Sequence, residues 1–275
     1  MNISEIIESA ESKHKERLET YLEELFSGIN LDSHGPEHHA RVWANARRII
    51  SSPLFAFTGP AHRFTEDLII ACYLHDSGMV VDKGARHGRI SSDHCIRYLA
   101  LSGLNPANYA ELTDAIEKHD NKDYTGQPDG SLLKNILSVA DDIDAFGITG
   151  IYRYFEIYLE RGISKKSIGS EILKNATGRF NNLKTVLWQL PEIVGEQEVR
   201  FEMLKQFCTG YNNQVDTYSF KDGNPSGYCG IAELLEEMLS YKKGIRQLIE
   251  EIESSRIDIF IRDFFRTLNT ELDGK

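Results

Sequence analysis

The sequence predicts an all-α protein. Apolar residues recur with the helical period of 3.6 along most of the chain, and no stretch of useful length alternates as a strand does. Helix start and stop signals also punctuate the chain, such as residues 32–36 before one apolar-periodic segment and residues 51–53 after it. With 275 residues the chain can form one large domain or two small ones, each with its own core.

The expected helices follow the chain in order. Pro36 suits the first turn of the second helix, and Asn105 with Pro106 begins the fifth. Polar loops are expected at residues 78–88 and, most clearly, at residues 120–130, which are rich in Asp, Asn, Gly and Pro. The expected helices cover residues 3–25, 36–50, 60–74, 91–101, 106–119, 131–144, 149–160, 165–175, 178–190, 195–218 and 231–268, the last in two parts joined near 254–255.

Composition limits the partners. The net charge of −11 gives no general attraction to DNA, RNA or an anionic membrane, so an anionic substrate needs a local source of positive charge. The longest apolar run, residues 68–74, is too short to span a bilayer. The four cysteines contain no Cys-x-x-Cys pair, and the N-terminus is acidic without a hydrophobic signal region. We therefore expect a cytoplasmic protein with reduced cysteines.

An adjacent imidazole and carboxylate, His75 and Asp76, end the most apolar predicted helix. Neither belongs on an apolar surface unless something holds it there. A divalent metal ion satisfies both at once, because neutral imidazole and ionised carboxylate are good metal donors. A His-Asp pair alone is weak support for such a site, so the rest of the chain must decide.

Other histidines lie close together or at expected helix ends and loops, and a cluster of aspartates lies inside an apolar expected helix. They are His34, His38, His39, His87, His94, His119, Asp141, Asp142 and Asp144. A lone histidine on a helix is more often a surface or hydrogen-bonded core residue, and an Asp-Asp-x-Asp run is more often a solvated face. We assign His14 and His62 to that ordinary class and expect His94 to be structural. We further expect Asp142 to face solvent, Asp144 to pair with a base or helix end, and Trp43 and Trp188 to lie in the core.

At this point the chain resembles the HD-domain metal-dependent phosphohydrolases, an all-helical family defined by a His, a His-Asp pair and a later Asp. The segment Asp32-Ser33-His34-Gly35-Pro36-Glu37-His38-His39-Ala40-Arg41-Val42 is similar to the family's first motif, and this similarity selects His38 over His39. His75-Asp76 stands for the pair, and Ala140-Asp141-Asp142-Ile143-Asp144-Ala145-Phe146-Gly147 is similar to the last motif. The resemblance covers about residues 29–160.

The resemblance implies a helical-bundle HD domain at residues 29–160, preceded by a helical segment at 1–28. An additional helical region at 161–275 would pack on or beside it. The resemblance also implies that the metal ligands are His38, His75, Asp76 and Asp141, and that coordination positions stay open for water and substrate. His87 and His119 would complete a second metal site or, with Asp76, act in catalysis through hydrogen bonds or proton transfer.

The implied cofactor is one or two divalent ions per chain, Mn, Mg, Fe, Ni or Zn. The implied substrate is a small phosphate ester or anhydride, such as a nucleotide, with Lys83, Arg86 and His34 as candidate phosphate-binding or ligand-orienting residues. Ser77-Gly78-Met79-Val80 lacks the acidic pair of the guanosine tetraphosphate hydrolases, and the Gly-Tyr-Pro extension of the cyclic dinucleotide enzymes is absent.

Three functions stay open from the sequence: this hydrolase, a non-catalytic nucleotide- or metal-binding signalling module, and a diiron oxygenase of HD fold. The full set of four core ligands favours an enzyme. The oxygenase would need both His87 and His119 as ligands. The region after residue 160 has no recognisable motif, and covering the site, recognising a base and forming a homodimer are all open roles for it.

Overall fold

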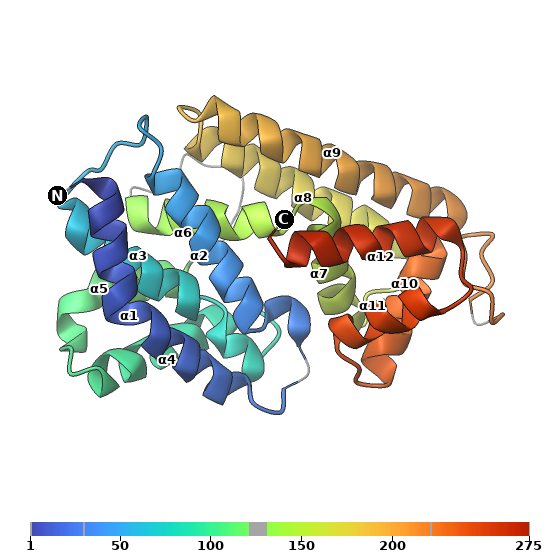
Figure 1. Cartoon of the computed structure of the whole chain (residues 1–275), viewed down its shortest axis with the longest axis horizontal. Helices are drawn as coiled ribbons and strands as arrows, with labels where there is room; N and C mark the ends of the chain where they lie inside the picture. Colours follow the sequence, from blue (N-terminus) through green and yellow to red (C-terminus); the bar gives the residue numbers. More distant parts are fainter. Residues whose placement is uncertain (1, 30, 121–130, 221, 275) are drawn as a thin grey trace. The chain divides into compact units, whose positions relative to one another are not determined.

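The structure, a computed structural model, describes residues 2–29, 31–120, 131–220 and 222–274. Within these ranges it contains twelve α-helices and three short 3-10 helices and no strand, so the predicted all-α class is confirmed (Figure 1). The α-helices are α1 Ile3–Phe26, α2 Pro36–Ile50, α3 Ala61–Leu74, α4 His87–Leu101, α5 Ala110–Glu117, α6 Leu132–Asp144, α7 Gly147–Glu160, α8 Lys165–Val186, α9 Pro191–Gln214, α10 Gly227–Ser240, α11 Ile245–Ser254 and α12 Ile259–Leu272. The 3-10 helices are η1 Asp32–His34, η2 Ser77–Val80 and η3 Pro106–Tyr109.

Helix ends follow the local signals closely at several places. Asn2 caps α1 in a capping box with Glu5, and Pro36 occupies the first turn of α2. Asn105 accepts a hydrogen bond from the backbone N–H of Ala107 and so caps η3. Residues 121–130, expected to be a loop, lie outside the described residues. Among the described helices none is long and apolar enough to cross a membrane.

Several helix boundaries differ from expectation; α9, for example, covers Pro191–Gln214 where residues 195–218 were expected. α4 begins at His87, four residues earlier than predicted, so His87 stands in a first turn and not in a loop. α8 is one helix through Gly178, because a single glycine costs a helix only about 1 kcal/mol. The stretch 231–268 forms three helices, and the first break contains Lys242, whose φ of 53° is left-handed and ends α10.

The chain divides into two compact units, residues 1–144 with 181–195, and residues 145–180 with 196–275. The division falls between α6 and α7, inside the expected 29–160 segment. It also assigns the end of α8 and the start of α9 to the first unit.

In the first unit α3 is the central helix. It contacts α1, α2, α4, α5 and α6, and each of its residues from Thr65 to Leu74 is buried. Burial on every side explains why residues 68–74, the second half of this helix, form a continuous apolar run. Because α3 ends at Leu74 in the interior of the unit, the next two residues, His75 and Asp76, are also buried.

In the second unit α7 packs against α10 and α12, and α11 packs against α12. Helices α8 and α9 run antiparallel: Phe180 stacks on Phe201 at one end, and at the other the Tyr211 hydroxyl donates to the Lys165 carbonyl at 2.9 Å (Figure 1). Aromatic rings fill the contact between α7 and α9, with Phe155 edge-on to both Phe207 and Tyr211.

Candidate metal centre

Three helices deliver four donor side chains to one point in the first unit. His38 lies in the first turn of α2, His75 and Asp76 directly follow α3, and Asp141 lies in the last turn of α6. α2, α3 and α6 contact one another pairwise. The Asn45 side-chain amide also donates to the Ala140 carbonyl at 3.1 Å, which ties α2 to α6 beside Asp141.

The donor atoms of His38, His75, Asp76 and Asp141 all lie within 4.8 Å of one another, and all four residues are buried. The two histidine Nε2 atoms are 3.2 Å apart. The Nε2 of His38 is 3.6 Å from Asp76 Oδ2 and 3.7 Å from Asp141 Oδ1, and the corresponding distances from His75 are 3.5 and 3.9 Å. Two donors on one ion with bonds of about 2.1 Å lie about 3.0 Å apart at octahedral right angles and about 3.4 Å apart in a tetrahedron. The observed separations therefore suit an ion at the centre.

The tautomers of His75 and His38 also fit a metal ion at this point. His75 Nδ1 lies 2.9 Å from the carbonyl oxygen of Cys72, which can only accept, so Nδ1 carries the proton. In the neutral ring Nε2 then presents its lone pair. His38 Nδ1 likewise donates to Asp144 Oδ2 at 2.8 Å. Two lone pairs and two carboxylates converge, an arrangement that is repulsive by itself and that a cation stabilises.

Asp144 orients His38 and is itself held by Arg41. The Arg41 guanidinium donates from Nε to Asp144 Oδ1 at 2.8 Å and from the Nη2 amine to Oδ2 at 3.0 Å. The expectation that Asp144 pairs with a base is thus confirmed. A carboxylate behind a ligand histidine fixes the orientation of the ring and raises its basicity.

A second group lies on the other oxygen of Asp76. Asp76, His87 and His119 have donor atoms within 4.8 Å of one another and are buried. Nε2 of His87 is 3.3 Å from Asp76 Oδ1, and Nε2 of His119 is 3.1 Å from the same oxygen. Both rings donate Nδ1–H to a carbonyl, His87 to Gly84 at 2.6 Å and His119 to Ile116 at 2.7 Å. Asp76 thus faces one group with Oδ2 and the other with Oδ1.

Two glycines allow the second group to assemble. A Cβ on Gly78 would lie 2.2 Å from the His87 carbonyl oxygen, and one on Gly88 would lie 2.5 Å from the Glu117 carbonyl oxygen. Only glycine permits η2 and α5 to approach the first turn of α4 this closely. These contacts bring His87 and His119 to Asp76.

Comparison with known proteins assigns no family. No family model matches the chain, and neither a curated protein nor a solved structure matches it significantly. What the site can do is therefore argued from its own chemistry.

Burial and the neighbouring charges set the protonation of the ligands. Burial lowers the pKa of His75 to about 3, despite the opposing charge of Asp76. Burial opposes the charge on Asp76, yet the adjacent histidines His75, His119 and His38 hold the pKa of Asp76 well below its usual range. The pKa of His119 is shifted in the other direction from that of His75. Burial lowers the pKa of His119, but the hydrogen bond to Asp76 and the charge of Asp76 outweigh burial, so the net effect raises this pKa. Neutral His75 and ionised Asp76 are the forms that bind a metal.

The remaining predicted site residues surround the ligands less closely. His34 is buried, its Nδ1 is 2.7 Å from Ser33 Oγ, and its ring lies 5.5 Å from that of His38. Lys83 is half-buried. Arg86 is exposed and paired with Asp82 at 2.7 Å. Phosphate binding by these three residues stays a prediction.

His39, which helical spacing could not separate from His38, stands outside both groups. It is fully buried with its ring edge-on to Phe26, and burial holds its pKa well below the usual range. Its ring also lies 5.1 Å from that of His75. The structure thus places His38 among the donors and His39 behind them.

Two expectations were wrong. Asp142 does not face solvent: it is fully buried, and the side-chain amide of Asn182 donates to its Oδ2 at 3.1 Å. Trp188 is not in the core but 70% exposed, because it falls in the turn between α8 and α9 where Leu187 and Leu190 fill the buried positions. Trp43 is buried as expected, with its indole N–H donating to Glu11.

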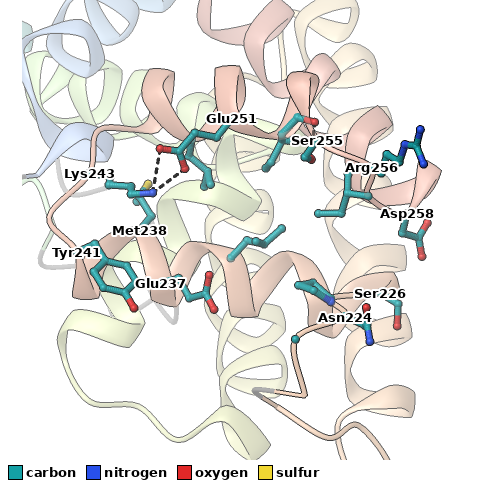
Figure 2. Close-up of a pocket in the computed structure, with 16 residues that line it drawn as sticks. Asn224, Ser226, Glu237, Met238, Tyr241, Lys243, Glu251, Ser255, Arg256 and Asp258 are labelled. Atoms are coloured by element: carbon teal, nitrogen blue, oxygen red, sulfur yellow. Dashed lines mark hydrogen bonds and ion pairs between the residues drawn. The ribbon is translucent and has the colours of Figure 1, made fainter.

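A concavity of about 570 Å³ lies in the second unit between α10, α11 and residues 255–258 (Figure 2). Its lining includes buried Leu234, Met238, Leu248 and Ile252, and Lys243 pairs with Glu251 on its rim at 2.6 Å (Figure 2). None of the predicted site residues lines it, and no histidine is among its described lining residues. It therefore offers no set of metal ligands comparable to those in the first unit.

Proposed function

We propose that this chain is a metal-dependent phosphohydrolase of the HD-domain type, acting on a small phosphate ester such as a nucleotide. One observation carries the proposal: the donor atoms of His38, His75, Asp76 and Asp141 converge on one buried point, within 4.8 Å of one another. The sequence motifs that contain these four residues occur in the order and spacing of that family.

The residues present fit a divalent ion of the Mn, Fe, Ni or Zn type. Two imidazole nitrogens and two carboxylate oxygens form a mixed donor set, whereas Mg²⁺ prefers oxygen ligands and water. When bound, such an ion supplies a Lewis acid that polarises a phosphoryl oxygen and acidifies water. It also supplies the local positive charge that a chain of net charge −11 needs in order to bind an anion.

The chain's own residues have distinct roles in this proposal. Arg41 and Asp144 hold His38 in one tautomer and orientation, and the Cys72 carbonyl does the same for His75. His87 and His119 stand on the opposite side of Asp76. There they hold a second ion or place a proton donor beside the substrate.

The second group gives one specific reason to consider an alternative, a diiron oxygenase. That activity needs both His87 and His119 as ligands, and both Nε2 atoms do face Asp76 Oδ1. A diiron protein would show bound iron and visible absorbance after purification. A hydrolase would be active with redox-inert ions and without oxygen.

The test is to purify the protein, measure its metal content, and assay it with Mn²⁺ or Mg²⁺. Substrates are bis-p-nitrophenyl phosphate, p-nitrophenyl phosphate and a nucleotide panel. Asp76→Ala should abolish both hydrolysis and metal binding while the helical circular dichroism signal persists. His62→Ala, which changes a half-exposed histidine on α3, is the matched control and should retain both. Full activity in Asp76→Ala would exclude this site as the catalytic centre.

A further inference from the structure

The concavity of about 570 Å³ in the second unit has no part in the proposed function (Figure 2). It lies between α10 and α11, and the four residues 241–244 that join these helices lie at one end. Residues 223–226 and 255–258 border the other end. The lining stretches of the two helices, 234–241 and 248–255, are each about 10 Å long at the helical rise of about 1.5 Å per residue. Volume and length both suit a small molecule, because ligand pockets usually measure about 300–1,000 Å³.

The floor of this concavity is apolar. Leu234 and Met238 from α10 and Leu248 and Ile252 from α11 contribute to it, and all four residues are buried. Small-molecule sites typically combine such a lining with a few polar groups that fix the orientation of the ligand. The apolar floor therefore suits a ligand with an apolar body, and the charged groups on the walls decide which polar group that ligand carries.

Most of the charged side chains in the lining already have partners. The Glu251 carboxylate accepts from the Lys243 ammonium with both oxygens, at 2.9 and 2.6 Å. The Asp258 carboxylate accepts from the backbone N–H groups of Phe260 at 2.8 Å and of Gly227 at 3.3 Å. These three charged groups therefore serve the protein's own structure.

Glu237 and Arg256 are the other charged residues of the described lining, and neither has an ion pair or side-chain hydrogen bond within the described part of the chain. The Arg256 guanidinium is directed away from the space between α10 and α11 (Figure 2). Glu237 lies on the α10 wall, across from Glu251 on the α11 wall (Figure 2). The charge that this concavity offers to a ligand is therefore the Glu237 carboxylate.

Lys243 shows which kind of group this end of the concavity accommodates. While Glu251 binds it, the Lys243 ammonium also lies 5.9 Å from the centre of the Tyr241 ring. A carboxylate together with an aromatic ring is a favourable environment for an ammonium group. Glu237 is four residues before Tyr241 and so lies on the same face of α10. A second ammonium group at Glu237 would thus lie in a similar environment.

We propose that this concavity binds a small primary amine with an apolar body, whose ammonium group pairs with Glu237 and whose body lies on the apolar floor. A primary ammonium can donate hydrogen bonds to the carboxylate, whereas an apolar carboxylate would place its negative charge between Glu237 and Glu251. The inference goes beyond the proposed function and is independent of it, because every residue involved belongs to the second unit.

The experiment is a calorimetric titration of the full-length protein at pH 7 with n-octylamine, n-octanol and octanoate. The three probes have eight carbons each and differ in charge. We expect octylamine to bind at one site per chain and at least about tenfold more tightly than octanoate, with octanol between them, because hydrogen bonds to a charged group are the stronger ones.

Substitutions on the two walls locate the site. Glu237→Gln should lower the octylamine affinity to about that of octanol. Glu250→Gln, which changes an exposed carboxylate of α11 outside the lining, is the control for the loss of one negative charge and should leave the affinity unchanged. Glu237→Lys should reverse the preference, so that octanoate binds more tightly than octylamine. Because Glu237 is exposed, its substitution should not disturb folding.

Each contrary result overturns a stated part of the inference. Absence of saturable octylamine binding to the wild type would exclude the site. Equal affinity for the three probes would show that the apolar chain alone is recognised and would overturn the role of Glu237. A preference for octylamine that persists in Glu237→Lys would place the amine elsewhere on the protein. None of these results changes the proposal for the metal centre, which metal content and hydrolysis test separately.

Discussion

Polar side chains are arranged differently in the second unit and at the candidate metal centre of the first unit. In the second unit donors meet acceptors: the Tyr152 hydroxyl donates to Glu156 at 3.0 Å, and the Tyr218 hydroxyl donates to Glu233 at 2.5 Å. At the candidate metal centre of the first unit acceptors meet acceptors, because the Nε2 atoms of His38 and His75 face each other and the carboxylates. Paired donors and acceptors stabilise a fold by themselves, whereas converging acceptors need a cation.

Helix α12 of the second unit provides another carboxylate, Glu271, whose hydrogen-bond partners are all protein groups. The Glu271 carboxylate accepts from the backbone N–H groups of Ile148 and Thr149 at 3.2 and 2.9 Å, at the start of α7. Arg200 pairs with the same carboxylate at 3.5 Å. Glu271 thus caps a helix whose N-terminus carries partial positive charge. The comparison therefore predicts that carboxylates of the two units will respond differently to substitution.

The largest difference is expected at two neighbouring carboxylates of α6. Asp141→Asn should reduce Mn²⁺ affinity more than about 100-fold, since a lost ligand should exceed the effect of losing an outer-shell partner. Asp142→Asn, equally buried but paired with Asn182, should retain the metal. Equilibrium titration of both variants measures this. An equal loss in both would show that buried charge, and not coordination, governs binding.

A buried histidine outside both groups provides the next test. His14 is 4% exposed, and burial lowers its pKa to about 4. The unfolded chain binds this proton near pH 6.5 and the folded chain only near pH 4, so stability is complete above pH 6.5 and falls as the pH drops toward 4. The loss attributable to His14 is at most about 3 kcal/mol.

Urea unfolding of the metal-free protein between pH 7 and pH 4 measures this effect. His14→Leu should flatten the pH dependence, and His62→Gln, on a half-exposed side chain, should not change it. An unchanged slope in His14→Leu would show that other titratable groups cause the acid sensitivity.

Asp144→Asn should weaken Mn²⁺ binding about 10- to 100-fold, equivalent to about 1.4–2.7 kcal/mol. The amide can still accept a hydrogen bond from His38 but no longer stabilises positive charge on the ring. The Asp142→Asn variant again serves as the control. If the variant binds Mn²⁺ as tightly as the wild type, the charge of Asp144 does not contribute to metal binding through His38.

The smallest effect is expected in the second unit. Glu271→Ala should lower the free energy of unfolding by about 1–2 kcal/mol, the usual cost of losing a helix cap, and leave Mn²⁺ affinity unchanged. Chemical denaturation and the same titration measure the two quantities. A change in metal affinity would contradict the separation between structural and metal-binding carboxylates.

Local patterns predicted the helices well wherever the burial of one face and a cap coincide. Pro36 and Asn105 begin elements where expected, and the apolar run to Leu74 is the central buried helix. Prediction from local sequence failed where contacts with residues far away in the chain determine the structure. α8 continues through Gly178, and Asp142 is buried against Asn182, forty residues away in the chain. Periodicity cannot reveal such a partner.

The candidate site shows the same division. The residue types and motif order singled out His38, His75, Asp76 and Asp141, because imidazole and carboxylate next to apolar helix ends are costly without a cation. The sequence by itself therefore determined an all-helical chain and the chemistry of its candidate metal ligands. Only the tertiary structure decided that Asp144 stands behind His38 and that Asp76 faces two groups. These facts depend on distances between helices, which are set by packing contacts such as those at Gly78 and Gly88 and not by local periodicity.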